Sequence, residues 1–301
     1  MIKISNIFTY IPSNYLNLQK QYKNLSKEFF HQKIGTMKVA RKKKNETVID
    51  MCEKVVSLKK LDRIKKKIKL LILCTQNPDH GGLPHNSVIL QKKLNLNKDI
   101  ACFDISQGCA GYLYGLKIAE AFLKKNEVCL FFTCDPYSKI IKPKNYNTEV
   151  LFGDAATLTI LEKSKKKNLK GLIDSSFFSD GSHYKDIINY NGCLRMNGKN
   201  VMQFVKSVVP KLINSFLKKN KLKISQIDKF YFHQGSKHIV SLLNRSMNLD
   251  KKNSSIYLKN LGNTVSSSLP ILLSKDKFKK KKKIIICGFG VGLSVSIGLL
   301  I

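Results

Sequence analysis

Apolar runs long enough to form buried strands recur along the chain, and they constrain its fold more than any other feature. Ile68–Thr75, Val128–Cys134 and Ile284–Phe289 contain almost only apolar side chains, as strands buried on both faces do. At 104–111 and again at 231–237, such a strand ends in a short polar turn and a helix follows. This alternation predicts an α/β fold.

The alternation occupies both parts of the chain, which predicts two α/β halves of similar length. The Lys-rich stretch Glu162–Lys170 is the best candidate for their boundary. We therefore expect an N-terminal half at 1–165 and a C-terminal half at 166–301. With 301 residues, 43% of them hydrophobic, the chain is long enough to bury a sizeable core.

The chain is strongly basic, with 54 lysine and arginine residues, 20 acidic residues and a formal charge of +34. Three explanations are open: lysine scattered over every solvated face, a local basic rim for an acidic protein or a phosphate-bearing coenzyme, and nucleic-acid binding. The basic runs lie between apolar segments, as loops and solvated helix ends do: 41–44, 65–67, 165–167 and 279–283. Nucleic-acid binding requires a recognition motif as well, so we expect no nucleic-acid partner.

The eight cysteines form no CxxC pair and no zinc-binding pattern, so we expect no metal and no cofactor. Most of them lie in apolar runs, where a free thiol packs as a small hydrophobic group, and this usage predicts a reducing cytoplasm. The N-terminus has no signal-peptide pattern. The longest apolar stretch, 284–301, is interrupted by glycine and serine, which indicates two buried strands and no membrane span.

Three polar residues and one glycine-rich turn are candidates for a functional site. Cys109 lies where a helix begins, and the unpaired N–H groups there favour a thiolate and lower the pKa of the thiol. His233 ends a buried strand, and Asn263 precedes a Ser-rich apolar helix. Each has a structural alternative: a packed cysteine, a hydrogen-bonded core histidine and a helix N-cap. The Cys-Gly-Phe-Gly-Val-Gly-Leu turn at 287–293 lets backbone N–H groups face a ligand, but alone it is weak evidence.

Taken together, these segments resemble the 3-oxoacyl-(acyl-carrier-protein) synthase III family. Five motifs match in the family's order and rough spacing: 104–116 around the nucleophile, 151–156 (Leu-Phe-Gly-Asp-Ala-Ala), 233–234 (His-Gln), 262–264 (Gly-Asn-Thr) and 288–292 (Gly-Phe-Gly-x-Gly). The resemblance extends from about residue 4 to the end of the chain.

The resemblance implies a thiolase-like fold, in which two similar halves stack as five layers, α-β-α-β-α, usually in a homodimer. It also implies a catalytic triad of Cys109, His233 and Asn263. Cys109 takes an acyl group from a thioester, and the backbone N–H groups of Cys109 and Val291 hold the oxyanion. His233 and Asn263 donate hydrogen bonds to a malonyl thioester while it loses carbon dioxide.

Further roles are implied with less support from the motifs. Leu83, just before Pro84, falls at the family position that closes the acyl pocket across the dimer, and Phe289 is a second pocket candidate. The implied substrates are an acyl-coenzyme A or acyl-carrier protein and malonyl-acyl-carrier protein. Because carrier proteins are acidic, Lys237 and, more weakly, Lys206 are candidates for docking them.

The residue types distinguish this chain from relatives of the same fold. Asn263 argues against the chain-elongating synthases, which use a second histidine. Cys287 lies inside an apolar run, so we interpret it as core and not as the second cysteine of a thiolase. A non-decarboxylating condensing enzyme needs a Glu base, and the loop 76–84 offers only Asp79. That activity, and a non-catalytic protein that binds acyl groups or carrier proteins, remain the alternatives.

Several positions depart from the family pattern. The chain has no tryptophan, whereas the family uses Trp and Arg to clamp the adenine of coenzyme A, and we align Met37 with that Arg. Lys237 and His238 replace the Arg expected after His-Gln, and Gln203 stands where Lys is common. These changes make acetyl-coenzyme A a doubtful primer but leave the condensation chemistry unaffected. Surface-polysaccharide or specialised lipid acyl groups are plausible destinations by resemblance alone.

Overall fold

The computed structural model describes residues 1–56, 61–164, 171–275 and 282–301. The strands are β1 (Ile2–Tyr10), β2 (Asn14–Asn17), β3 (Lys38–Arg41), β4 (Ile68–Cys74), β5 (Ala101–Ile105), β6 (Val128–Cys134), β7 (Ala156–Lys163), β8 (Gly171–Ser179), β9 (Ile187–Tyr190), β10 (Cys193–Met196), β11 (Lys229–Phe232), β12 (Ile284–Gly290) and β13 (Ser294–Leu300). The helices are α1 (Leu18–Gln21), η1 (Phe29–Ile34), α2 (Val48–Val55), α4 (Asn86–Lys93), α5 (Gly111–Phe122), α6 (Tyr146–Glu149), α7 (Gly198–Lys219), α8 (Lys237–Ser246) and α9 (Ser268–Lys275), besides short 3-10 turns.

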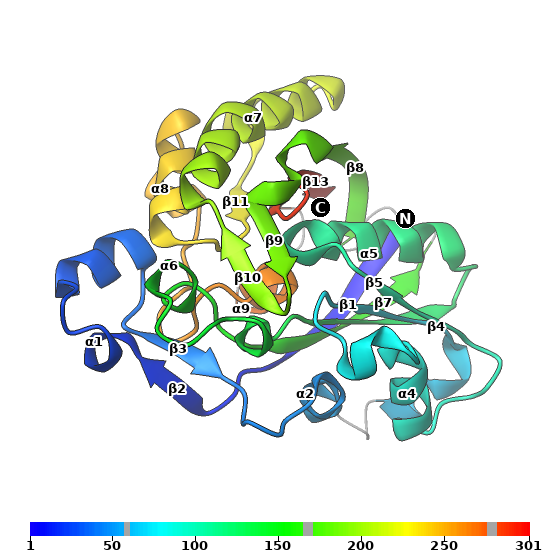
Figure 1. Ribbon diagram of the computed structural model, residues 1–301. Helices are drawn as coiled ribbons and strands as arrows, with labels where there is room; N and C mark the ends of the chain where they lie inside the picture. The colour runs from blue at the N-terminus through cyan, green and yellow to red at the C-terminus, as the bar shows by residue number, and fades with distance from the viewer. Residues whose placement is uncertain (57–60, 165–170, 276–281) are drawn as a thin grey trace.

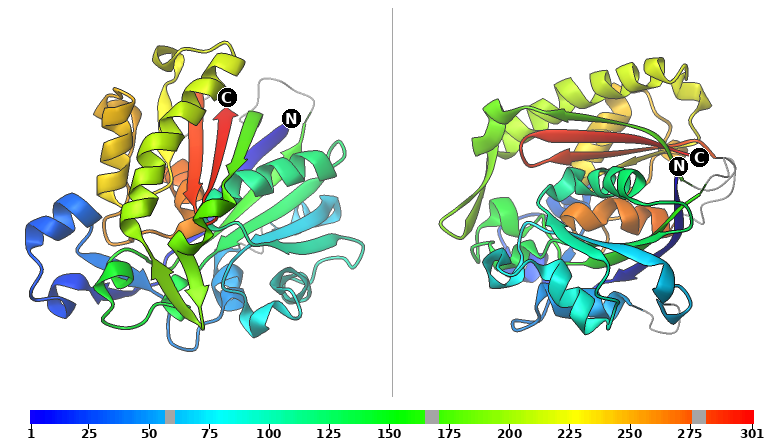
Figure 2. Two further views of the ribbon diagram at one scale, coloured as in Figure 1. Left: turned by 45° about the horizontal axis from the view of Figure 1, so that its top comes forward. Right: turned by 90° about the vertical axis from the view of Figure 1, so that its right-hand side faces the viewer.

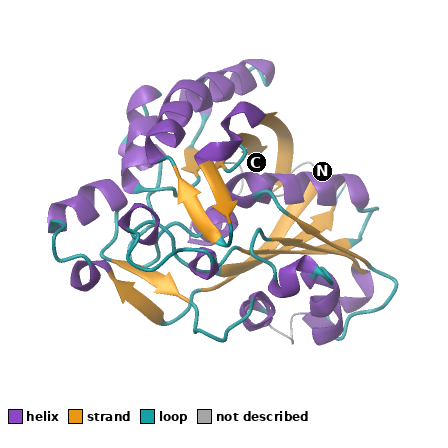
Figure 3. Cartoon of the chain, viewed as in Figure 1, coloured by secondary structure: helices purple, strands orange, loops and turns teal. Residues whose placement is uncertain are grey.

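Within these residues, nine strands form one mixed sheet in the order β11-β12-β13-β8-β1-β7-β6-β4-β5 (Figures 1 and 3). Its two parts join at β1 and β8 through two residue pairs, Ile2 with Leu172 and Lys3 with Gly171. Every strand on the β1 side of this junction precedes residue 165, and every strand on the β8 side follows residue 170. The predicted boundary at 165–166 lies outside the described residues and stays a prediction, as do the basic runs at 165–167 and most of 279–283.

The two parts of the sheet repeat one topology. In the first, β6 is parallel to β4 and antiparallel to β7, and β7 is antiparallel to β1. In the second, β12 is parallel to β11 and antiparallel to β13, and β13 is antiparallel to β8. The fifth strand of the first part is β5; its counterpart in the second is a single bridge between Phe230 and Ser254. The segment after β5, which carries Cys109, is therefore equivalent to the segment that carries Asn263, and the turn 231–237 is equivalent to the one after β4.

Helices cover both faces of each part and produce five layers (Figure 2). The apolar helices α5 and α9 lie between the two parts, because each contacts strands on both sides of the junction. The outer layer on one side consists of α2 and α4, and the outer layer on the other consists of α7 and α8. This arrangement confirms the five-layered thiolase-like fold expected from the sequence.

The predicted strands were confirmed wherever a continuous apolar run marked them, as in β4, β6 and β12. The two-stranded sheets β2–β3 and β9–β10 were not predicted, since their burial is mixed and short polar strands carry little pattern. Among the described residues, none of the helices is both long and apolar enough to cross a membrane, and no cluster of His, Cys, Asp and Glu is suited to a metal ion.

Candidate active site

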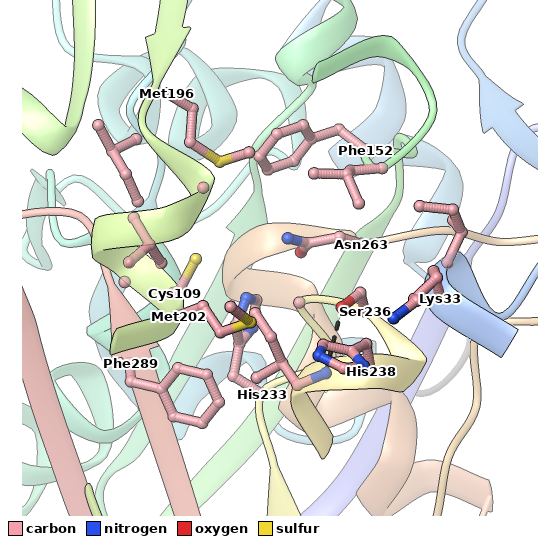
Figure 4. Close-up of a pocket in the computed structure, with 18 of the residues that line it drawn as sticks. Lys33, Cys109, Phe152, Met196, Met202, His233, Ser236, His238, Asn263 and Phe289 are labelled. Atoms are coloured by element: carbon pink, nitrogen blue, oxygen red, sulfur yellow. Dashed lines mark hydrogen bonds between the residues drawn. The ribbon is translucent and has the colours of Figure 1, made fainter. Parts of the chain in front are cut away.

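A cavity of about 260 Å³ brings the three predicted catalytic residues together. Cys109, His233 and Asn263 all line it, although they come from three segments spread over more than half of the chain (Figure 4). The rest of its wall is mostly apolar and includes Phe152, Met196, Met202 and Phe289 from both parts of the fold. The cavity can therefore accept a largely apolar group and bring it to a cluster of hydrogen-bonding atoms.

Cys109 is held at the start of the central helix by close backbone packing. It lies in the 3-10 turn Gly108–Ala110, which leads directly into α5. The glycine-rich end of β12 crosses beside it: a Cβ at Gly290 would come within 2.9 Å of the cysteine Sγ and Cβ. Asp104, in the same motif, is structural, because its carboxylate accepts hydrogen bonds from the N–H groups of Asn86 and Ser87 at the start of α4.

The thiol of Cys109 is less acidic than the sequence suggested. Burial raises its pKa, and the charge of Asp135 raises it further. The backbone N–H groups of Cys109 and Val291 act in the opposite direction, as expected for a helix start, but they do not outweigh desolvation. The prediction of a lowered pKa was therefore wrong for the unliganded site, because the helix N-terminus is buried with the sulfur.

His233 extends the end of β11 and turns one ring nitrogen away from the cavity. Its backbone N–H donates to the carbonyl of Cys287 at 2.8 Å, which continues the β11–β12 pairing. Its Nδ1 lies 2.7 Å from the hydroxyl oxygen of Ser268, the first residue of α9. Burial lowers the pKa of His233 to about 3, so the ring is neutral near pH 7. If the Ser268 hydroxyl donates to Nδ1, the ring proton resides on Nε2.

Asn263 is fixed by the Phe-Gly-Asp segment. Its backbone N–H donates to the carbonyl of Leu151, and its carbonyl accepts from the N–H of Gly153, both at 2.8 Å. No larger residue fits at Gly153, where a Cβ would lie 1.8 Å from the carbonyl oxygen of Leu261. The side-chain Oδ1 accepts a hydrogen bond from Val265 N–H at 2.8 Å, so the amide NH₂ is left as the free donor.

The two donors therefore share one design. With the Ser268 hydroxyl as donor to Nδ1 of His233, the accepting atom of each side chain is engaged by the protein, and the N–H groups remain for a ligand. Together with the N–H groups of Cys109 and Val291 at the sulfur, the cavity presents hydrogen-bond donors at two places. Such a site stabilises negative charge on two different oxygens.

The remaining predicted residues occupy different places. Phe289 lines the cavity, and its ring meets that of His233 edge-on with the centroids 5.5 Å apart. Leu83 is 86% exposed and is not part of the cavity wall. Lys237 lies half-buried near the cavity and donates to the side chain of Gln32, whereas Lys206 is exposed on α7. The roles given to these residues stay predictions.

The structure also shows where Cys287 and Asp79 lie, the two residues considered above as possible counterparts of the bases in related enzymes. Cys287 is fully buried in β12 and does not line the cavity, in agreement with its interpretation as core. Asp79 is buried outside the cavity, where its carboxylate accepts from Ile49 N–H at 3.0 Å and pairs with Lys139 at 3.2 Å. Neither is available as a base at Cys109.

The sequence reasoning missed the residues that surround the cavity mouth. Phe29 and Lys33 of η1 line the cavity together with His238 of α8, which the sequence analysis named only as part of the replacement for the family's Arg. Met37, which we aligned with the family's coenzyme-binding Arg, packs against the cluster around Leu18 and is not among the residues that line the cavity. Phe29 and Lys33 are four residues apart on η1, a spacing that is visible in the sequence but is too common to indicate a functional site.

Comparisons with known proteins agree over the whole chain. The family model of 3-oxoacyl-[acyl-carrier-protein (ACP)] synthase III matches residues 103–181, and the C-terminal model of the same family matches residues 217–300. The chain is similar to beta-ketoacyl-[acyl-carrier-protein] synthase III of Acholeplasma laidlawii, with 30% identity over 304 residues that cover 97% of this chain and 96% of that protein. Its similarity to the protein of that name from Clostridium botulinum (strain Okra / Type B1) is 28% over 316 residues, with the same coverage.

Solved structures show the same similarity. A crystal structure of a 3-oxoacyl-(acyl-carrier-protein) synthase III superimposes with a TM-score of 0.91 and 25% identity, and covers 99% of both chains. The 3-oxoacyl-[acyl-carrier-protein] synthase III of Aquifex aeolicus VF5 superimposes with a TM-score of 0.89 and 25% identity, over 100% of this chain and 99% of that one.

Proposed function

The chain belongs to the 3-oxoacyl-(acyl-carrier-protein) synthase III family, and we propose that it joins an acyl thioester to malonyl-acyl-carrier protein in a decarboxylative condensation. One observation carries this proposal. His233 and Asn263 have their acceptor atoms engaged by Ser268 and Val265 and present neutral N–H donors beside Cys109. Donors without a base suit an enolate formed by loss of carbon dioxide.

The first half-reaction is acyl transfer to Cys109. The thiolate sulfur attacks the thioester carbonyl, and the oxyanion accepts hydrogen bonds from the N–H groups of Cys109 and Val291. The carbon–sulfur bond of the donor then breaks, and the departing thiolate takes up the proton that the cysteine has lost. The acyl group is left on the enzyme and the carrier thiol leaves.

The second half-reaction begins when a malonyl thioester enters. Its thioester carbonyl accepts hydrogen bonds from Nε2–H of His233 and from the amide of Asn263. Breakage of the bond to the carboxylate releases carbon dioxide and places negative charge on that carbonyl oxygen, where both donors stabilise it. The enolate carbon attacks the acyl group, and collapse of the tetrahedral adduct releases the 3-oxoacyl product and the Cys109 thiolate. The thiolate then takes a proton from water, because burial raises the pKa of the thiol.

The non-decarboxylating alternative is less well supported. It requires a base that removes a proton from the second substrate. Asp79, the one acidic candidate in the loop before Pro84, is engaged by Ile49 and Lys139 outside the cavity. The intact set of donors likewise favours catalysis over simple binding.

The proposed partners are an acyl carrier protein and a second copy of the chain. Lys33 and His238 line the cavity. Burial lowers the pKa of His238, and the nearby charges of Lys33 and Arg245 lower it further. This basic rim, extended by Lys237, fits an acidic carrier protein. A homodimer is supported by the edge strand β5, which pairs with β4 on one side and has no partner strand on its other side among the described residues. Eight unpaired thiols suit the cytoplasm.

The test separates the two half-reactions. Cys109→Ala should abolish acyl transfer, detected as a mass increase of the intact protein. His233→Ala and Asn263→Ala should lose malonyl decarboxylation by roughly two or more orders of magnitude, the loss expected for a removed oxyanion donor. Acyl transfer should survive better in these two variants, and an equal loss of both half-reactions would show that the division of roles is wrong.

A further inference from the structure

A second, smaller chamber adjoins the main cavity. It has a volume of about 150 Å³ and shares Tyr137, Ile187 and Val291 with the main cavity. Because the N–H of Val291 faces the sulfur of Cys109, the chamber begins next to the proposed oxyanion site. Cys109 itself does not line the chamber, so an acyl group on its sulfur would enter the chamber past the three residues that the two spaces share.

The chamber differs from the main cavity in its chemistry. The main cavity is lined mostly by apolar side chains, whereas Gln76, Ser106 and Asn189 contribute to the wall of the chamber. Its apolar part consists of Ile140, Ile188 and Leu194 together with the shared residues.

Gln76 is oriented by Tyr137. The phenol O–H donates to Oε1 of Gln76 at 2.6 Å, and the backbone N–H of Gln76 donates to buried Asp135 at the same distance. The tyrosine ring is itself packed against Phe152, with the centroids 4.8 Å apart. Within the described part of the chain, the amide nitrogen of Gln76 and the hydroxyl of Ser106 have no hydrogen-bond partner in the protein. A fixed donor therefore faces a chamber that accommodates part of a ligand.

The volume limits what enters. An apolar protein cavity of about 150 Å³ accommodates benzene, which has six non-hydrogen atoms. The chamber therefore suits the end of an acyl group with four or five carbon atoms. Filling it with hydrocarbon alone removes water from the amide of half-buried Gln76 without replacing the hydrogen bond, which is unfavourable, whereas Ser106 is exposed and can stay hydrated.

We propose that the Gln76–Tyr137 pair makes this chain select an acyl group with a hydrogen-bonding substituent, such as a hydroxyl on the third carbon, over its methyl isostere. This inference rests on the proposed acyl transfer to Cys109 and names its substrate class. A site built to hydrogen-bond a hydroxyl rejects the analogue that lacks it, because the polar groups of the protein are then left unpaired. The partly open chamber should give a preference of about tenfold, the effect of one net hydrogen bond.

The test compares two donors of one shape. Rates of acyl transfer to the full-length protein are measured by intact mass with 3-hydroxybutyryl-coenzyme A, both enantiomers supplied, and with 3-methylbutyryl-coenzyme A. The wild-type protein should favour the hydroxyl donor by about tenfold. In Gln76→Leu, which removes the amide but keeps most of the volume, the ratio should fall to about one or below.

A second variant tests whether the pair, and not the amide alone, carries the selection. Tyr137→Phe keeps the ring but removes the hydroxyl that holds Gln76, so the ratio should fall part of the way toward one, and a ratio kept at the wild-type value would show that the tyrosine hydroxyl plays no part. Gln91→Leu, on α4 and outside both cavities, is the matched control and should leave it unchanged. A wild-type ratio at or below one, or an unchanged ratio in Gln76→Leu, would overturn the inference. Absence of transfer from every donor, acetyl included, together with no malonyl decarboxylation, would refute the proposed function and the inference with it.

Discussion

Replacing Ser268 with alanine removes the partner of the His233 ring without touching the cavity. Both residues are buried, and the hydroxyl lies 2.7 Å from Nδ1. With the donor gone, nothing else in the described structure satisfies Nδ1, and the proton gains access to either ring nitrogen. The fraction of His233 with a proton on Nε2 falls, and with it the donor that the malonyl carbonyl requires.

The size of the effect follows from one hydrogen bond. A net contribution of about 1 to 1.5 kcal/mol corresponds to a loss of roughly tenfold in the rate of malonyl decarboxylation. This loss is smaller than that expected for His233→Ala, because the ring itself remains. Acyl transfer to Cys109 uses other donors and should change by less than about twofold.

The assay measures carbon dioxide released from a malonyl thioester and, separately, the acyl mass increase of the intact protein. Ser268→Thr retains a hydroxyl and should recover most of the decarboxylation that Ser268→Ala loses. A Ser268→Ala variant that decarboxylates at the wild-type rate would refute the role of the hydroxyl. An equal loss in both half-reactions would indicate that Ser268 only stabilises the fold.

Three further predictions concern pH, the pocket and docking. Because burial lowers the pKa of His233 to about 3, the ring stays neutral, and the rate of malonyl decarboxylation should not change between about pH 5 and 8. A rate that declines as the pH falls, with a midpoint near 6.5, would show an ordinary, solvated histidine. Leu83→Phe should shift the chain-length profile toward shorter acyl groups, by several-fold for the longest donors, if exposed Leu83 closes the pocket of a second copy; an unchanged profile would refute that role. Lys237→Glu should raise the Michaelis constant for carrier-protein substrates several-fold with little change in turnover, and added salt should mimic it, whereas an equal effect on coenzyme A substrates would exclude docking.

Much of the fold was visible in the sequence because burial on both faces leaves a continuous apolar run. This is why β4, β6 and β12 were predicted close to their observed limits. The short hairpin β9–β10 was not, since its four-residue strands show neither a continuous apolar run nor a regular alternation that would distinguish a strand from a loop.

The polar side chains that meet in the cavity were also predictable, but their hydrogen-bond partners were not. Cys109, His233 and Asn263 lie in local motifs, whereas Ser268 reaches His233 only through the packing of α9 against β11. The direction of the Cys109 pKa was missed for a related reason. The helix start is a local feature, but the desolvation that outweighs it comes from the tertiary fold.

The fate of the malonyl carboxylate tests the central claim most directly. Wild-type protein is first acylated at Cys109 and then given malonyl-acyl-carrier protein labelled with carbon-13 at the free carboxylate. Decarboxylative condensation predicts that the label leaves as carbon dioxide and that the product, two carbon atoms longer than the acyl group, is unlabelled. A condensed product that retains the label would contradict the proposed mechanism and favour a non-decarboxylating enzyme of the same fold.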